Sequence, residues 1–153
     1  MKNILKMCTG ILILLSLGGC FGEDYDFSPP TVTISPTVND IINIDLKEAN
    51  IDWRGENNKP YKKETKDISK LAAKQQALAV GAETQGNLRF DNEDFSVGGL
   101  TISVLRNNEK HELKLNEEDR AFDFPKEKGK YVIVVDLYTD RGEAQYVGNI
   151  VVK

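Results

Sequence analysis

The sequence predicts a mainly β fold, an antiparallel β-sandwich of about seven or eight strands with one inserted helix. From residue 31 onward, apolar and polar residues alternate along most segments, the pattern of strands with one face in a core. One run, 131–135, is apolar at every position, as expected of a strand covered on both faces. A single segment, 67–80, repeats its apolar residues with the helical period instead.

The first strands are short and well delimited. The first alternates over residues 32–35 and ends at Pro36. A third strand contains a candidate core tryptophan, Trp53, and ends at Gly55, and the polar segment 56–66 after it is predicted to form a loop. The second strand, between these two, places its apolar residues on one face: Ile42, Ile44 and Leu46.

Residues 67–80 are predicted to form the inserted helix. Asp67 or Thr65 can cap its first turn, and Gly81 can end it. Because the inward stripe is rich in alanine, we expect the helix to pack closely against a sheet. The stripe consists of Ile68, Leu71, Ala72, Gln75, Leu78 and Ala79.

Two hairpins are expected in the second half of the chain. The first joins residues 100–104 to 111–115 through the turn signal Asn107-Asn108. The second joins 129–138 to 144–152 around Asp140-Arg141-Gly142. Shorter elements complete the pattern: a strand around 88–90, an acidic turn at 91–94, a glycine break at 98–99 and a strand over 122–124.

The last quarter also contains a tyrosine with a predicted structural role. Tyr131 opens a run of β-branched residues, two positions after a glycine, and a Phe-x-Phe-Pro segment at 122–125 precedes it. This arrangement resembles the penultimate strand of immunoglobulin-like sandwiches, in which a tyrosine bonds back to the preceding corner. The resemblance covers residues 122–153 and implies such a bond for Tyr131. The Cys…Trp…Cys signature of antibody domains is absent.

The N-terminus has the layout of a secretory signal. Lys2 and Lys6 precede an uncharged apolar segment, 7–17, which is shorter than the roughly 20 residues of a membrane-spanning helix. The segment ends in Leu17-Gly18-Gly19-Cys20, which resembles the bacterial lipobox. The resemblance implies cleavage between Gly19 and Cys20 and attachment of a diacylglyceryl group to the Cys20 thiol. A conventionally cleaved or uncleaved signal, with an incidental thiol at Cys20, is the alternative.

Three regions are therefore expected: a signal peptide at 1–19, a tether at 20–30 and the β-sandwich at 31–153. Cleavage would leave 134 of the 153 residues, enough for one domain, and the net charge of −4 would become −6 as two lysines leave. An acidic domain disfavours nucleic acid as a partner. Because Cys8 leaves with the signal and Cys20 is lipidated, no disulfide is expected.

The sequence contains no recognisable catalytic or metal-binding motif. His111 is the only histidine, and neither Gly-x-Ser-x-Gly nor His-Glu-x-x-His occurs. We therefore expect a protein that is not an enzyme and that holds no cofactor or metal. The carboxylates of 91–94 could supply oxygens to Ca²⁺, but they lack the spacing of a calcium loop, and a solvated turn is the alternative.

The most distinctive surface feature is a basic run in an otherwise acidic domain: Lys59, Tyr61, Lys62, Lys63 and Lys66. It is interpreted either as a recognition surface for a protein, an envelope polymer or anionic lipid, or as a solvated loop.

The expected function is a non-enzymatic binding or accessory module, held at the outer face of a bacterial membrane through Cys20. A small-ligand or metal carrier is the alternative. Phe21 follows Cys20, so the aspartate that marks inner-membrane retention in Gram-negative lipoproteins is absent. The composition, rich in Lys, Asn and Ile, favours a Gram-positive source and the outer leaflet of its plasma membrane.

Overall fold

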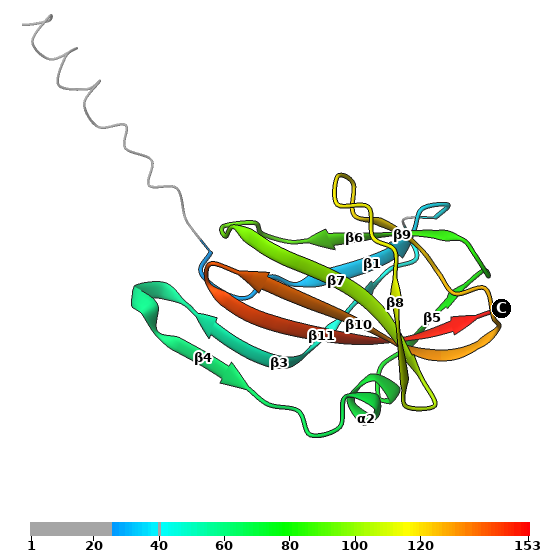
Figure 1. Ribbon diagram of the computed structural model, residues 1–153, viewed down its shortest axis with the longest axis horizontal. Coiled ribbons are helices and arrows are strands. Elements are labelled where there is room, and N and C mark those ends of the chain that lie inside the picture. Colours follow the sequence, from blue (N-terminus) through cyan, green and yellow to red (C-terminus); the bar gives the residue numbers. More distant parts are fainter. Residues whose placement is uncertain (1–25, 40) are drawn as a thin grey trace, which may run out of the picture.

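The computed structural model describes residues 26–39 and 41–153, which form two antiparallel sheets packed face to face (Figure 1). This confirms the predicted β-sandwich. The four-stranded sheet has the order β2-β1-β6-β9, with β1 at Val32–Pro36, β2 at Ile44–Asp45, β6 at Gln85–Phe90 and β9 at Ala121–Asp123. The seven-stranded sheet has the order β4-β3-β11-β10-β7-β8, with β4 at Pro60–Lys63, β3 at Lys47–Arg54, β11 at Gly142–Val152, β10 at Gly129–Thr139, β7 at Val97–Arg106 and β8 at Glu109–Leu113. Its remaining strand, β5 (Ala77–Val80), pairs in parallel with the end of β11.

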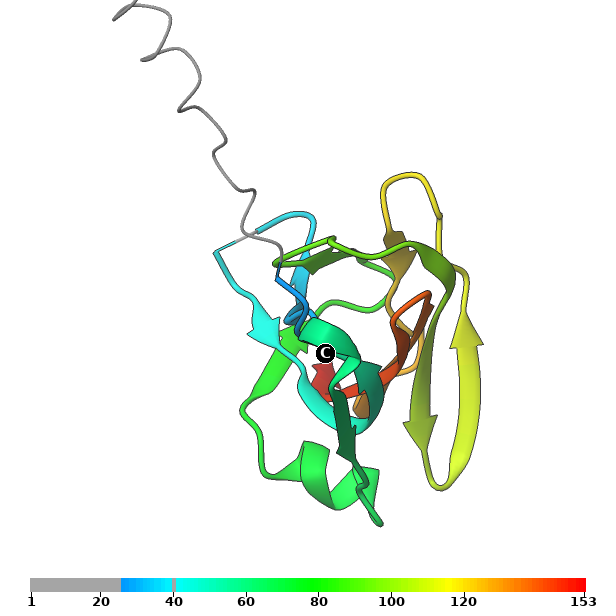
Figure 2. The same ribbon diagram turned by 90° about the vertical axis from the view of Figure 1, so that its left-hand side faces the viewer.

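The main core lies between the two sheets, which the end-on view of Figure 2 shows as separate layers. Ile133 and Val135 of β10 are buried in this core. The opposite face of β10 is covered as well, because Val134 packs with Val147 and Ala72 in a smaller cluster with helix α2 (Ile68–Ala73). Coverage on both sides explains why the run at 131–135 is apolar throughout.

The predicted tyrosine bond is present. The Tyr131 hydroxyl donates to the carbonyl oxygen of Glu127 over 2.8 Å. Strands β11, β10, β7 and β8 follow the order of the G, F, C and C′ strands of immunoglobulin domains, and β1, β6 and β9 follow A, B and E. Trp53 is buried, as predicted, but it lies on β3 rather than on β7, the strand in the place of the usual tryptophan.

The inserted helix is shorter than predicted. It begins as expected, with Asp67 as the N-cap accepting from the backbone N–H of Lys70, but it ends at Ala73 rather than at residue 80. Residues 77–80 form β5 instead. Leu78 and Val80 are buried in the main core, with the two-residue period of a strand. The end of β11 offers them a backbone partner, and this pairing outweighs the helical propensity of the alanines.

The segment predicted as a loop at 56–66 is also partly ordered. A short 3₁₀ turn, η1 (Glu56–Asn58), reverses the chain, and β4 then pairs antiparallel with β3. All four residues of β4 are exposed, so this edge strand has no buried apolar face. Its polar sequence therefore indicated a loop. With β4 and β5 included, the described chain contains eleven strands.

Residues 26–30, within the predicted tether, lie against one end of the sandwich. Trp53 Nε1 donates to the carbonyl oxygen of Phe27 over 3.0 Å, and the Arg141 guanidinium lies 4.6 Å from the centre of the Phe27 ring. The backbone N–H of Asp26 donates to the Asp94 carboxylate. The predicted signal peptide at 1–19, Cys20 and the tether up to residue 25 lie outside the described residues. Among the residues that are described, no helix has the length and apolar character to span a bilayer.

Candidate functional site

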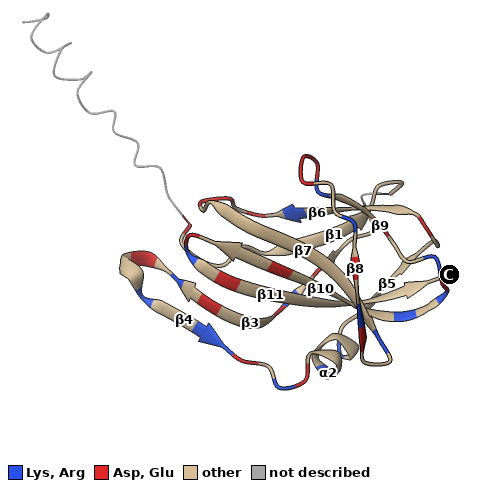
Figure 3. Cartoon of the chain, viewed as in Figure 1, with Lys and Arg blue, Asp and Glu red and all other residues tan. Residues whose placement is uncertain are grey.

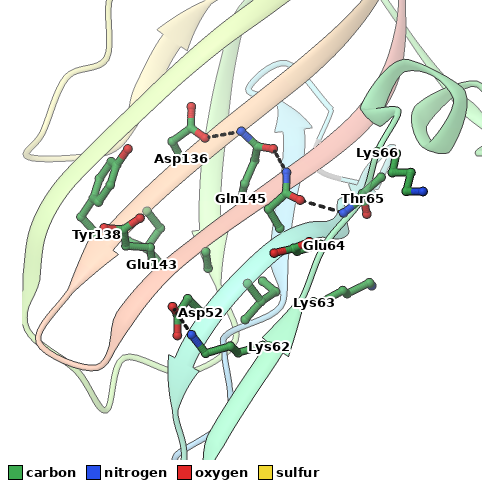
Figure 4. A pocket seen from close by; sticks show the side chains of 14 residues that line it. Asp52, Lys62, Lys63, Glu64, Thr65, Lys66, Asp136, Tyr138, Glu143 and Gln145 are labelled. Carbon is green, nitrogen blue, oxygen red and sulfur yellow. Dashed lines mark hydrogen bonds and ion pairs between the residues drawn. The ribbon is translucent and has the colours of Figure 1, made fainter.

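A polar groove of about 500 Å³ runs over the outer face of the seven-stranded sheet (Figure 4). Its floor is made by outward side chains of the neighbouring strands β3, β11 and β10. One wall is formed by Lys62 and Lys63 of β4 together with residues 64–66, which lead into α2. Because these elements are packed strands, their backbones hold the floor side chains in a defined register.

The first row of floor side chains crosses three strands. Asp136, Gln145 and Asn50 stand directly opposite one another in the β10–β11–β3 register. Gln145 Nε2 donates to Asp136 Oδ1, and Asn50 Nδ2 donates to Gln145 Oε1, each over 2.7 Å. The backbone N–H of Thr65 completes the row by donating to Asn50 Oδ1 over 2.8 Å. These bonds orient both amide groups, so the row is fixed rather than freely rotating.

The second row lies two residues further along each strand. Tyr138, Glu143, Asp52 and Lys62 are opposite one another across β10, β11, β3 and β4. Lys62 Nζ is 2.8 Å from Asp52 Oδ2, and Tyr138 is 47 % exposed. The Glu143 side chain makes no hydrogen bond or ion pair with the described part of the chain. This row therefore offers one unpaired carboxylate and one exposed aromatic ring.

Two β-bulges flank these rows. On one side, the β10–β7 register shifts after Tyr138 and leaves Gly98 as the extra residue, with the Tyr138 side chain against Gly99. On the other side, the β11–β3 register shifts between Gln145 and Tyr146 and leaves Ala49 as the extra residue. Bulges redirect side chains and are common beside binding sites.

The basic run predicted from the sequence as an interaction surface does not form one continuous surface in the structure. Lys62, Lys63 and Lys66 line the groove, whereas Lys59 and Tyr61 line a separate cavity of about 820 Å³ beside Phe27 and Trp53.

Two lysines of the basic run are paired with acids of β3, and Figure 3 shows blue residues on β4 beside red residues on β3. Lys63 Nζ lies 3.6 Å from a Glu48 carboxylate oxygen, and the Tyr61 hydroxyl donates to the same oxygen over 2.8 Å. The hydrogen bond to Asp52 raises the pKa of Lys62 above its ordinary value. Two of the four lysines of the run are therefore neutralised, whereas Lys59 and Lys66 have no ion pair among the described residues.

The floor of the groove was missed from the sequence. Its members are Asn50, Asp136, Tyr138, Glu143 and Gln145. Asn50 and Gln145 are 95 residues apart, so only the strand order brings them together. One local signal was available: Asp136 and Gln145 are polar residues in strands whose outward neighbours Val134 and Val147 are apolar.

The acidic turn at 91–94 uses its carboxylates within the protein. Asp91 Oδ1 accepts from the backbone N–H of Thr31 over 2.7 Å, and Glu93 makes a bidentate pair with Arg120 at 2.6 and 3.1 Å. The hydrogen bond from Arg120 lowers the pKa of Glu93. His111 is exposed and lies 3.7 Å from Glu109. Within residues 26–39 and 41–153, no three His, Cys, Asp or Glu side chains are grouped so that they could hold a metal ion.

Comparison with protein-family models and with curated proteins gave no match to this chain.

Proposed function

We propose that this chain is a lipid-anchored, non-enzymatic binding module outside the cytoplasm, and that the groove over β3, β11 and β10 is its binding surface. The observation that carries the proposal is the hydrogen-bonded row Asp136–Gln145–Asn50 on the part of the sheet face that α2 leaves uncovered. Side chains that are held by one another in a fixed orientation have already lost the rotational freedom that binding would otherwise cost. The groove is open and extended, which suits a long partner better than an enclosed small molecule.

The attachment supports a position close to the membrane. Cys20 precedes Asp26 by six residues, which can span at most about 20 Å. The chain then meets the domain at Phe27, which Trp53 and Arg141 hold. Diacylglyceryl attachment supplies two acyl chains, enough for stable anchoring. In the proposed arrangement the domain stays near the outer leaflet of a Gram-positive plasma membrane.

Two experiments test this function. Mass spectrometry of the protein from its native host should find the diacylglyceryl group on Cys20, and Cys20→Ser should release the protein or leave it as uncleaved precursor. A photoreactive amino acid at position 143, inside the groove, should crosslink a partner in intact cells. The same residue at position 118, on an exposed loop outside the groove, is the matched control. A bare Cys20 thiol, or equal crosslinking from both positions, would contradict the proposal.

One observation favours a small-ligand carrier as the second candidate. The hydroxyl of Tyr146 is buried without a hydrogen-bond partner among the described residues, and Tyr146 lines a cavity of about 420 Å³ beside Glu48 and Lys63. A bound molecule that displaced the side chains covering this hydroxyl could supply the missing partner. Native mass spectrometry of protein from its host should then show a retained small molecule that Tyr146→Phe loses.

A further inference from the structure

The charge balance of the groove disfavours a strongly anionic ligand. Its lining contains four carboxylates against three ammonium groups: Asp52, Glu64, Asp136 and Glu143 against Lys62, Lys63 and Lys66. Lys62 and Lys63 are already paired with Asp52 and Glu48, and Asp136 is paired at 2.9 Å with Lys110, which lies outside the lining. Lys66 has no ion pair among the described residues. A polyanion would therefore gain mainly from Lys66, and it would be repelled by Glu64 and Glu143, two carboxylates without an ion pair among the described residues. The groove is suited to an uncharged partner.

The first row presents donors and acceptors side by side. Each amide has two N–H groups and an oxygen with two lone pairs. Asn50 uses one N–H toward Gln145 and one lone pair toward Thr65, and Gln145 uses one N–H toward Asp136. Each amide thus retains one N–H and at least one lone pair. Hydroxyl groups complement such a surface because each of them both donates and accepts.

The second row adds a carboxylate acceptor and a flat apolar surface. Glu143 can accept from two neighbouring hydroxyl groups. The Tyr138 ring lies against Gly99 of β7, where an added Cβ atom would meet Tyr138 Cδ2 at 3.6 Å, an ordinary contact. With 47 % of the residue exposed, the ring can stack on the C–H face of a sugar.

We propose that the groove binds an uncharged glycan chain laid across β10, β11 and β3, an inference that rests on the proposed function and names its ligand class. Neighbouring strands are about 4.8 Å apart, comparable to the length of one sugar unit, so successive units meet successive strands. An extended peptide fits the floor less well, since β-strand addition needs unpaired backbone groups. Strands β10 and β11 lie inside the sheet, paired on both sides.

The test uses the full mature protein in detergent micelles and the tetramer of N-acetylglucosamine as the probe, with calorimetry as the readout. Glu143→Gln and Tyr138→Ala should each weaken binding about tenfold, the loss expected for one hydrogen-bonding or stacking contact. Glu118→Gln removes one carboxylate charge outside the groove, as Glu143→Gln does inside it, and this variant should bind the tetramer as the native protein does. Inorganic polyphosphate should not compete.

Each other outcome overturns the inference. The first is that the tetramer shows no saturable binding and wall glycan stripped of anionic polymers does not bind either. The second is that Glu118→Gln weakens binding of the tetramer as much as Glu143→Gln does. The third is that polyphosphate displaces the tetramer. Crosslinking of a protein from position 143 in cells would contradict the inference that the ligand is a glycan, while leaving the proposed binding function intact. A bare Cys20 would remove the proposed anchoring and leave the binding measurement unaffected.

Discussion

The Tyr131 hydroxyl bonds the carbonyl oxygen of Glu127, four residues earlier, at 2.8 Å. The Arg106 guanidinium lies 5.2 Å from the centre of the same ring, and its Nη1 donates to the hydroxyl over 3.0 Å. One side chain therefore ties the loop before β10 to the end of β7. Both strands belong to the seven-stranded sheet that carries the groove, and the corner lies at the opposite end of β10 from Tyr138.

Removing the Tyr131 hydroxyl should destabilise the protein measurably. We expect Tyr131→Phe to lower the free energy of unfolding by about 1–2 kcal/mol, because the Glu127 carbonyl and Arg106 both lose a partner while the ring packing remains. Urea denaturation followed by tryptophan fluorescence measures the change. Tyr138→Phe is the control, since its hydroxyl is on an exposed residue and its loss should stay within about 0.5 kcal/mol. Equal effects of the two changes would refute a structural role for the corner.

Removing the Tyr146 hydroxyl, in contrast, should not lower the free energy of unfolding. The hydroxyl is buried without a partner among the described residues, and burial raises its pKa further above the ordinary tyrosine value. Since an unsatisfied buried polar group costs free energy, Tyr146→Phe should leave the stability of the free protein unchanged or raise it by about 1 kcal/mol. The midpoint of urea denaturation reports this. A loss of more than about 1 kcal/mol would show that the hydroxyl is satisfied, for instance by a buried water.

Gly142, at the start of β11, should tolerate a side chain far less well than Gly98 of β7. The φ of Gly142 is +136°, and a Cβ atom there would overlap the carbonyl group of Asp52 on β3. We expect Gly142→Ala to cost about 2–4 kcal/mol, because backbone strain adds to the displacement of β3. Gly98→Ala is the comparison: a Cβ atom there meets the Tyr138 carbonyl oxygen at 3.6 Å, an ordinary contact. Thermal or urea unfolding of the two variants should rank them in this order.

The Glu93–Arg120 pair should give a small acid-dependent stability. The hydrogen bond from Arg120 lowers the pKa of Glu93 below its ordinary value of 4.5. The pair therefore stabilises the protein fully above pH 4.5, and the contribution is lost as pH falls through the lower folded-state pKa.

The size of this effect is limited, because the Glu93 side chain is 57 % exposed and solvent screens the pair. We expect Glu93→Gln to cost less than about 1 kcal/mol at pH 7 and close to nothing at pH 2. Urea denaturation of both proteins at the two pH values measures the difference. A cost that persists at pH 2 would mean that packing of Glu93, rather than its charge, is responsible.

The features that the sequence predicted well are local in origin. The turn at Asn107-Asn108 forms with φ values of 52° and 66°, which asparagine tolerates better than most residues. The β10–β11 hairpin turns at Asp140-Arg141, and Tyr131 reaches an oxygen only four residues away. Each of these depends on neighbouring residues alone.

The features that the sequence missed depend on distant partners. Residues 77–80 form a strand because β11 lies beside them, although the same alanines and leucine also fit a helix. The polar residues of β4 are ordered because β3 pairs with them and offers Glu48 and Asp52 to their side chains. In both cases a backbone pairing partner overrides local propensity.

The amino-acid sequence by itself determined the β-sandwich, its hairpins, the tyrosine corner and the prediction of a lipid anchor at Cys20, since alternation, turn residues and a short contiguous motif are properties of the chain. The tertiary structure alone decided the groove. Asn50, Asp136 and Gln145 become one hydrogen-bonded row when β3, β11 and β10 align in register. No local pattern encodes that alignment, because strand order and register follow from burial of the whole sheet.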